Sequence, residues 1–381
     1  LQAGGAGLIF ISEIMLARVL DAAGYGLFAT VMAWAQVLAM VALLGSNNLL
    51  LRFVPVYVAT ADWPHLRGLV RYCQRGGIVL GFSVVGVSVL VLAALNGRID
   101  SETRWAFMIG MAALPVAALS LQRQAILRGL HRVAVALSPD LIVRPAGLIL
   151  MIAALAWVFE VQLGASHALA VSGMAFLLAF GLGHYWLRQA MPAQANACPA
   201  SSQSREWLRI AAPLFLIAMM QLLIVRLDIM LLGMLKGHDQ AGHYAAASRV
   251  ADLIVFALAS ANVIVAPLIA GLHARNDLAG MQKMLTLLTK GVTLLTIPLV
   301  LLMVVFGRHI LGFFGAGYDI AYIPLLILVC GQIVNALSGP VDFVMSMTGQ
   351  QMKMLPLLAL AAGLNLGLNL LLIPPFGLTG A

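Results

Sequence analysis

Uninterrupted apolar runs constrain the fold of this chain more than any other feature of its sequence. Leu27–Ser46 and Gly76–Leu95 each contain 20 residues without a charged side chain. A helix of about 20 apolar residues crosses a hydrocarbon core of about 30 Å. Neither run alternates polar and apolar residues, as the strands of a membrane barrel do. Because backbone groups in lipid must be hydrogen-bonded within their own segment, these runs predict transmembrane helices.

Composition extends this prediction to the whole chain. Of its 381 residues, 62% are hydrophobic and 9% are charged, whereas a typical soluble domain has about 25% charged residues. Such a chain has too few polar groups to cover a water-soluble surface, so we expect an all-α polytopic membrane protein. Eleven spans are predicted, at roughly 3–20, 27–46, 76–95, 105–121, 138–158, 168–187, 208–235, 244–270, 284–306, 320–347 and 355–373.

The distribution of the cations predicts the orientation in the membrane. Of the 22 Lys and Arg residues, 14 fall in loops on one side and five in loops on the other. Cytoplasmic loops are enriched in Lys and Arg, so the N-terminus and the Arg-rich loops of this multi-pass protein are expected in the cytoplasm. The net charge of +8 then reflects topology and contact with anionic membrane lipids, and no nucleic-acid partner is expected.

Two segments of the chain repeat. RVLDAAGYGLFA (18–29) resembles KGHDQAGHYAAA (236–247), and PVYVATADWPHL (55–66) resembles PLIAGLHARNDLAGM (267–281), which places Asp62 over Asp277. Each repeat contains six spans, an even number, so both enter the membrane in the same direction. We therefore expect two parallel repeats around a central cavity: an N-terminal lobe (1–187), a cytoplasmic linker (188–206) and an incomplete C-terminal lobe (207–381). The chain is expected to be trimmed at both ends.

Motifs of other protein classes are missing from the sequence. It has no GxxxxGK[ST], HExxH or GxSxG, and its three cysteines lie in separate segments without a CxxC pair. Neither a cofactor, a metal site nor an enzymatic activity is expected.

Several motifs resemble those of a known family. GYGLFA after the first span, LLGSNNLLLRFVP at the end of the second, RLDIMLLG, and AGHYAAASRVADLI are similar to segments of the polysaccharide and O-antigen flippases. These flippases belong to the multidrug/oligosaccharidyl-lipid/polysaccharide exporter superfamily. The resemblance covers nearly the whole chain, with about eleven of the twelve to fourteen spans usual in that superfamily.

The resemblance implies a flippase that translocates a polyprenyl-diphosphate-linked oligosaccharide across the bacterial inner membrane by alternating access. Its partners would be the lipid-linked oligosaccharide, the membrane lipids and polysaccharide assembly proteins. A drug or cation antiporter of the same superfamily and a peptidoglycan-precursor flippase remain alternatives. An antiporter should have an acidic cavity, whereas the four cations and three acids considered below favour a cationic one.

The charged residues inside the predicted spans are the candidate site residues. Placing a charge at mid-bilayer costs about 2.5–3.5 kcal/mol on insertion scales, so such a side chain faces a cavity or a partner. Arg226 and Asp228 are two residues apart, about 200° around a helix, so each needs its own partner on another helix or on a ligand. Arg249 and Asp252 are three apart and can pair with each other or with the first two. A structural ion pair is the alternative to a site in both cases.

The resemblance implies that cations on inward-facing helices hold the diphosphate, and guanidinium groups suit this role because they bind phosphate oxygens as a fork. The candidates are Arg226, Arg249, Arg18 and Arg52. Arg52 is alternatively a membrane anchor, and Arg18 a cation at a helix C-terminus. Glu13, Asp228 and Asp252 are candidates for proton or sodium coupling, and Asp342 is a weaker one.

Two further patterns have structural interpretations. Ser138 followed by Pro139 predicts the start of a helix, which would place Asp140 at its N-terminus in a purely structural role. GIVLG (77–81) and GLNLG (363–367) match GxxxG and predict tight helix contacts.

Overall fold

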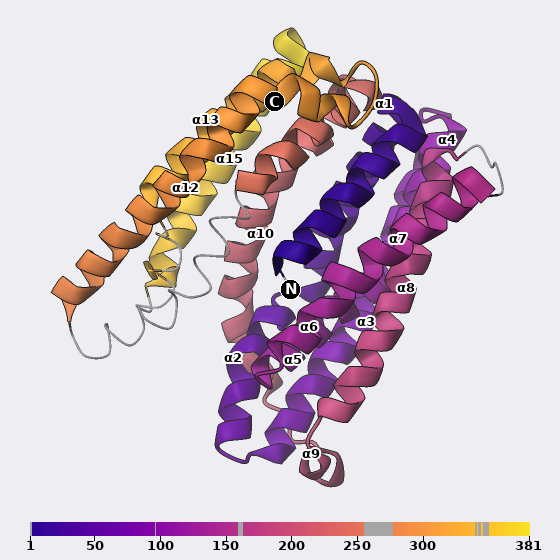
Figure 1. The fold of residues 1–381 in the computed structure, drawn as a ribbon. Coiled ribbons are helices and arrows are strands. Elements are labelled where there is room, and N and C mark those ends of the chain that lie inside the picture. The colour runs from indigo at the N-terminus through magenta and orange to yellow at the C-terminus, as the bar shows by residue number, and fades with distance from the viewer. Residues whose placement is uncertain are drawn as a thin grey trace. The chain divides into compact units, whose positions relative to one another are not determined.

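The computed structural model of the chain describes residues 2–95, 97–158, 163–254, 277–339, 341, 344–345 and 350–381. Their regular structure is helical throughout, and no strand occurs among them (Figure 1). Nine stretches of these residues are long and apolar enough to cross a membrane: Gly4–Leu43, Trp63–Ala94, Ser101–Gly129, Val133–Ala156, Ala165–Ala190, Ser204–Leu235, Ala279–Gly312, Tyr318–Ser338 and Met352–Thr379. The predicted all-α polytopic membrane class is confirmed.

Helix α1 (Gln2–Leu43) contains two predicted spans. Its 42 residues would be about 63 Å long as a straight helix, twice the thickness of a hydrocarbon core. Asp21 interrupts it with φ 61° and ψ −179°, a conformation that does not occur inside a helix. The interruption directly follows the predicted first span, so the two spans are joined without a loop.

The chain forms two compact units, which are described separately. Unit 1 contains Leu1–Ser12 and Leu27–Arg226, and unit 2 contains Glu13–Gly26 and Leu227–Ala381. These units differ from the lobes that the sequence predicts, because residues 13–26 fall in unit 2 and residues 207–226 in unit 1. The units divide inside helices α1 and α10 and not at the 188–206 linker. The lobes themselves remain a prediction.

Unit 1 is built from the first ten α-helices. After the parts of α1 that belong to it come α2 (Ser46–Ala59), α3 (Trp63–Ala94), α4 (Ser101–Ala112), α5 (Leu114–Gly129), α6 (Val133–Ser138), η1 (Pro139–Val143), α7 (Arg144–Ala153), η2 (Ala154–Val158), α8 (Ala165–Ala190), α9 (Ala193–Ala197) and α10 (Ser204–Leu235) up to Arg226. Arg52 and Arg71, expected in a loop, lie on α2 and α3.

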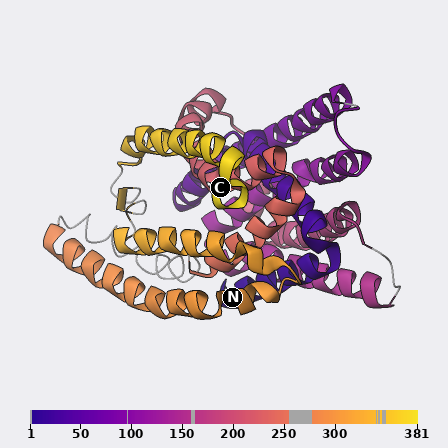
Figure 2. The same ribbon diagram turned by 90° about the horizontal axis from the view of Figure 1, so that it is seen from above.

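Unit 2 contains the rest of α10, a helix at 238–254, α12 (Leu278–Gly312), η3 (Tyr318–Ala321), α13 (Tyr322–Ser338), α15 (Gln351–Phe376) and η4 (Gly377–Thr379). Helices α12 and α13 lie side by side and run antiparallel through the short η3 connection (Figures 1 and 2). Of the predicted span 244–270, residues 255–270 lie outside the described residues, as does Asp342.

The helix starts at Asp62 and Asp277 support the predicted repeat. Asp62 caps α3 with φ −86° and ψ 72°, and Asp277 caps α12 with φ −86° and ψ 78°. Each carboxylate accepts a hydrogen bond from the backbone N–H three residues later, at 3.3 Å for Asp62 and 2.8 Å for Asp277. The two aligned residues therefore begin a long helix in each unit with the same capping geometry.

The linker between the predicted lobes is fastened to α3. Ser201 N–H donates to the Pro64 carbonyl at 3.0 Å, and Ser201 Oγ lies 3.1 Å from Nε2 of His65. The other ring nitrogen of His65 lies 2.8 Å from Asp62. The contacts from Asp62 through His65 to Ser201 have the acid–imidazole–hydroxyl order of a serine hydrolase triad. Because Asp62 is a helix cap and the Ser201 backbone is also bonded to α3, we interpret the contacts as an anchor.

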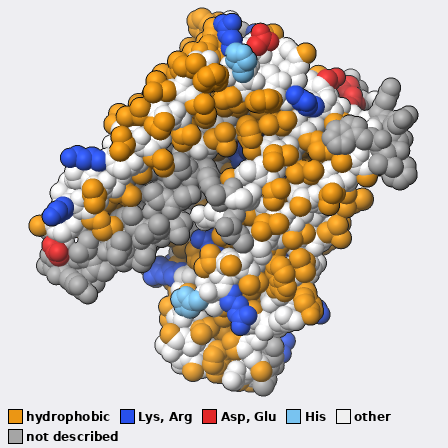
Figure 3. All heavy atoms as spheres, in the orientation of Figure 1, with side chains coloured by type: hydrophobic (Ala, Val, Ile, Leu, Met, Phe, Trp, Pro, Cys, Tyr) orange, Lys and Arg blue, Asp and Glu red, His pale blue; other side chains and the backbone are white. Residues whose placement is uncertain are grey.

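Large apolar side chains cover much of the surface. On α3, Phe82 is 64% and Leu90 70% exposed, and on α12 Leu287 is 73% exposed. Such residues also dominate the face drawn in Figure 3. Acyl chains, and not water, are the solvent that suits this surface.

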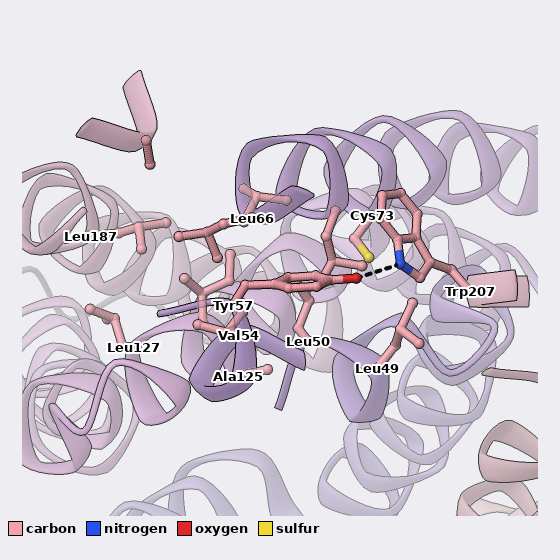
Figure 4. Packing of buried hydrophobic residues seen from close by; sticks show 14 of the residues in the cluster. Leu49, Leu50, Val54, Tyr57, Leu66, Cys73, Ala125, Leu127, Leu187 and Trp207 are labelled. Carbon is pink, nitrogen blue, oxygen red and sulfur yellow. Dashed lines mark hydrogen bonds between the residues drawn. The ribbon is translucent and has the colours of Figure 1, made fainter. Parts of the chain in front are cut away.

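A hydrophobic cluster joins seven helices of unit 1. Its buried members include Leu50 of α2, Leu66 of α3, Ala125 of α5, Leu187 of α8 and Trp207 near the start of α10 (Figure 4). The Trp207 indole is fully buried, and its Nε1–H donates to Tyr57 Oη at 3.2 Å. This hydrogen bond satisfies the one polar atom of the indole, so the cluster holds α10 against α2 without a buried unpaired group.

Trp207→Phe is therefore expected to lower the free energy of unfolding by about 1–2 kcal/mol, because it removes one hydrogen bond and some packed volume. The melting temperature in detergent measures this loss. Trp105→Phe is the matched control, since Trp105 is 57% exposed. Equal melting temperatures for Trp207→Phe and the unmodified protein would contradict the structural role of the indole.

Candidate functional site

Asp228 of α10 is the centre of a polar cluster in unit 2. Its Oδ2 accepts a hydrogen bond from Tyr244 Oη at 2.9 Å. Its Oδ1 accepts from the Nδ2 atoms of Asn365 at 3.2 Å and Asn369 at 2.9 Å. As expected, a charge inside a span has found polar partners on other helices. All three donors are neutral, so the cluster carries the negative charge of Asp228 and can accept a proton or a cation.

The sequence analysis missed Asn365 and Asn369. They stand four residues apart in GLNLGLNLL, and so lie on one face of an otherwise apolar helix α15. Two amides at this spacing in a membrane span are a signal for a polar site, but GLNLG was interpreted as a contact motif. The tight helix contact predicted at GLNLG is not found among the described residues. A Cβ added to Gly363 or to Gly367 would meet no neighbouring atom within 4 Å.

The other GxxxG segment makes the predicted contact. A Cβ on Gly77 would meet the side chain of Gln122 at 2.7 Å, and one on Gly81 would meet Pro115 at 3.0 Å. The two glycines therefore allow α3 and α5 to approach closely.

Glu13 and Arg249 form an ion pair in unit 2. Arg249 Nη2 lies 3.1 Å from Glu13 Oε1, and the side chains are 25% and 12% exposed. The fully buried Tyr25 donates its hydroxyl to Glu13 Oε2 at 2.9 Å. The contact from Arg249 to Asp252 is longer, 3.7 Å, and Asp252 is 47% exposed. The pairing of Arg249 with Glu13 was not anticipated, because 236 residues separate them in the chain.

Two glycines let the segments that carry these residues approach. A Cβ on Gly26 would overlap the His238 carbonyl, and one on Gly242 would overlap the Ala22 carbonyl. The segments around 22–26 and 238–242, which the sequence aligned as repeats, therefore pack backbone against backbone in unit 2. This packing places Tyr25 and Glu13 beside Arg249.

Arg226 is hydrogen-bonded within unit 1. Its Nε–H donates to Oε1 of Gln36 on α1 at 2.9 Å. Gln36 lines a cavity of about 370 Å³, and so does Leu222, one helical turn before Arg226. The polar residues around this cavity are Gln36, Ser120, Gln124, Asp140, Arg144 and Ser172. Arg226 is therefore tied to the wall of a partly polar cavity, whereas Asp228, two residues later, belongs to unit 2.

The structure overturns the predicted helix start at Ser138 and, with it, the placement of Asp140 at a helix N-terminus. The helix begins at Val133, not at Ser138, and Ser138 makes no side-chain cap. Asp140 therefore lies inside a continuous helical stretch, where it accepts hydrogen bonds from Arg123 Nη2 at 2.5 Å and from Gln124 at 3.0 Å. Arg123 is 1% exposed, and its guanidinium fills the space that a side chain on Gly183 would need. Asp140 balances this buried cation and lines the cavity.

The remaining two cations make surface contacts. Arg18 Nε–H donates at 2.7 Å to the carbonyl of Phe313, the C-cap residue directly after α12. Arg18 is thus a cation at a helix C-terminus, but of α12 and not of its own helix. The Arg52 guanidinium lies 5.6 Å from the centroid of the Phe53 ring. Arg52 is exposed and is not among the lining residues of the 370 Å³ cavity.

Metal-ligating side chains are not clustered in the part of the chain that the structure describes. No group of three His, Cys, Asp or Glu residues there could hold a metal ion. The candidate residues are of two kinds: guanidiniums, present in each unit, which can bind phosphate oxygens, and in unit 2 the carboxylate of Asp228, which can take up a proton or a monovalent cation.

Comparison with known proteins relates the chain to one family and one fold. A family model described as polysaccharide biosynthesis protein matches residues 1–273. No curated protein sequence matches the chain.

Among solved structures, an inward-facing multidrug resistance MATE family transporter of the MOP superfamily has a TM-score of 0.78 at 14% identity, covering 100% of this chain and 89% of the other. An outward-facing one has a TM-score of 0.71 at 14% identity, covering 100% and 88%. A MOP superfamily transporter from Pyrococcus furiosus Vc1, described as having a binding pocket of reverse polarity, has a TM-score of 0.72 at 13% identity, covering 100% and 87%. These similarities show the fold.

Proposed function

Because the chain belongs to the polysaccharide biosynthesis protein family, we propose that it is a flippase for polyprenyl-diphosphate-linked oligosaccharides. The match of the family model over residues 1–273 is the observation that carries this proposal. The protein acts in a bacterial inner membrane with its N-terminus in the cytoplasm. Its partners are the lipid-linked oligosaccharide, the surrounding lipids and polysaccharide assembly proteins. Transport by this route changes no covalent bond and needs no cofactor.

In this proposal the predicted lobes expose a central cavity to each side of the membrane in turn. The sugar and its diphosphate cross through the cavity while the polyprenyl tail stays in the bilayer. Arg226, Arg249, Arg18 and Arg52 are the candidates for holding the diphosphate. Arg226 is favoured among them, because its hydrogen bond to Gln36 orients the guanidinium beside the wall of a partly polar cavity.

Asp228 is the proposed coupling residue. Neutral hydroxyl and amide groups surround its carboxylate, so protonation or a bound cation can compensate its charge. The Oδ1 atoms of Asn365 and Asn369 are buried and accept no hydrogen bond from the described residues, which makes these oxygens available to a cation if the amides turn. Glu13 and Asp252 are weaker candidates, because Arg249 already compensates both.

The same cluster favours an alternative function. A carboxylate among neutral groups also suits a drug or cation antiporter, and this chain shares its fold with multidrug transporters. A peptidoglycan-precursor flippase would need the same cations as an oligosaccharide flippase, since its substrate also carries a polyprenyl diphosphate.

Deletion of the gene followed by leaflet-resolved labelling of lipid-linked glycans distinguishes these functions. A flippase for oligosaccharides predicts that the lipid-linked oligosaccharide accumulates on the cytoplasmic leaflet. Accumulation of the peptidoglycan precursor there would support the precursor flippase instead. Unchanged glycans together with new drug sensitivity would support the antiporter and contradict both flippase functions.

Arg226→Ala is expected to reduce transport about tenfold while the protein remains inserted and folded. A charge-assisted hydrogen bond to phosphate contributes about 1.5–3 kcal/mol, and its loss weakens substrate binding accordingly. Transport is measured by the same leaflet-resolved labelling, with folding checked by gel filtration. Arg209→Ala, an exposed cation on the same helix, is the control. Transport by Arg226→Ala at the rate of this control would remove Arg226 from the site.

A further inference from the structure

A second, cationic cavity in unit 1 shares no lining residue with the 370 Å³ cavity. Its volume is about 450 Å³, and it is enclosed by the first half of α3 and the end of α8. It is lined by Arg67, Val70, Arg71, Gln74, His184, Leu187, Arg188 and Met191. Three of these eight residues are arginines, and none is an acid.

The arginines are held in different ways. Arg67 Nη1 donates to the Cys198 carbonyl of the linker, which fixes one guanidinium at the wall. Arg188 Nε donates to His184 Nε2 at 3.2 Å, so the imidazole accepts a hydrogen bond and adds no positive charge in this arrangement. Arg71 and Arg188 are exposed at the rim. Three guanidiniums around one cavity, with no carboxylate among its described lining residues, favour an anionic ligand.

The depth of the cavity in the membrane follows from α3. Its 32 residues are about 48 Å long, so the helix extends well beyond a hydrocarbon core of about 30 Å. The exposed apolar side chains of α3 begin at Ile78, one helical turn after Gln74. On α8, Tyr185 is 57% exposed one turn before Arg188, and tyrosine is typical of the membrane–water interface. The cavity therefore lies at headgroup depth, next to a surface suited to acyl chains.

We propose that this cavity binds the phosphate of an anionic lipid in the leaflet that the sequence predicts to be cytoplasmic. Guanidinium groups bind phosphate oxygens as a fork, and basic pockets between membrane helices on the cytoplasmic side are typical sites for anionic headgroups. The volume accommodates a headgroup, while the acyl chains lie on the exposed apolar surface of α3. Two lipids have this chemistry: a bulk anionic phospholipid and a polyprenyl diphosphate. Binding of a bulk phospholipid does not depend on what the protein transports, whereas binding of a polyprenyl diphosphate rests on the proposed function.

Native mass spectrometry of the purified full chain in a neutral detergent tests the proposal, with phosphatidylglycerol, a polyprenyl diphosphate or phosphatidylcholine added. The test variant is Arg71→Gln combined with Arg188→Gln, which leaves the wall contact of Arg67 intact. The control is Arg205→Gln combined with Arg209→Gln, two exposed cations of α10 that line neither cavity. Both double variants remove the same charge.

The expected result is that anionic lipid binds more tightly than phosphatidylcholine and that the test variant weakens it about 25-fold, roughly fivefold for each cation. The control should retain the affinity of the unmodified protein. The anionic lipid whose affinity falls more in the test variant is the one that supplies the phosphate bound in this cavity. Equal losses in both variants would show attraction by overall charge and overturn the proposal, as would equal binding of phosphatidylcholine. Equal melting temperatures of the two variants confirm that a loss of binding is not a loss of folding.

Discussion

Asp228→Asn is expected to reduce the rate of transport at least about a hundredfold. The substitution keeps the size of the side chain, so the new amide still fits beside Asn365 and Asn369, but it removes the charge that a proton or cation would compensate. Interactions with a charged group are worth about 1.5–3 kcal/mol each, so the loss of the carboxylate eliminates tight ion binding. Transport measured by leaflet-resolved labelling, over a range of pH and sodium concentration, provides the readout.

The dependence on pH and sodium separates coupling from packing. If Asp228 is the coupling residue, the residual transport of Asp228→Asn no longer changes with the ion that drives the unmodified protein. Asp319→Asn is the matched control, because Asp319 is an exposed acid of the same unit in η3. Full transport by Asp228→Asn with its ion dependence intact would exclude Asp228 from coupling.

Arg249→Gln is expected to lower the free energy of unfolding by about 3–5 kcal/mol. Removing one partner of a buried ion pair leaves the other charge uncompensated, and Glu13 is only 12% exposed. Glu13→Gln combined with Arg249→Gln should recover most of this stability, because neither charge then remains. Unfolding in detergent measures each variant, and Lys236→Gln, an exposed cation of unit 2, is the control.

The double variant also tests the proposed substrate role of Arg249. If the guanidinium only balances Glu13, a protein without either charge is stable and transports normally. If the guanidinium also holds the diphosphate, the double variant is stable but transports about tenfold less, since one charge-assisted contact is missing. A double variant as unstable as Arg249→Gln would show that the pair is not coupled and contradict the ion-pair interpretation.

The prediction for Asp140 failed for a reason that applies beyond this residue. Ser138 and Pro139 are strong local signals for a helix start, yet the helix begins at Val133 and passes through them. Proline needs no backbone hydrogen bond at a first turn, but a wider turn inside a membrane helix also accommodates it. The local sequence therefore permits Pro139 either at the start of a helix or inside one. The structure has it inside, where Asp140 pairs with the buried Arg123.

The candidate site was only partly predictable. Arg226, Asp228, Arg249 and Glu13 could be found because a charge in an apolar span is costly wherever its partner lies. Their partners could not be found, because no sequence rule relates Glu13 to Arg249. The amides Asn365 and Asn369 were missed because an amide costs less than a charge in lipid, and because the segment of Asn365 was interpreted as the GxxxG pattern GLNLG (363–367).

The sequence by itself determined that this chain is a bundle of membrane helices and which side chains cannot face lipid. These properties follow from the free energy of transferring each residue into a bilayer, which depends on the residue and its neighbours in the chain. Only the tertiary structure decided that Asp228 meets Asn365 and Asn369, that Glu13 meets Arg249, and that three arginines enclose one cavity. Those contacts join distant segments, and their geometry depends on how whole helices pack.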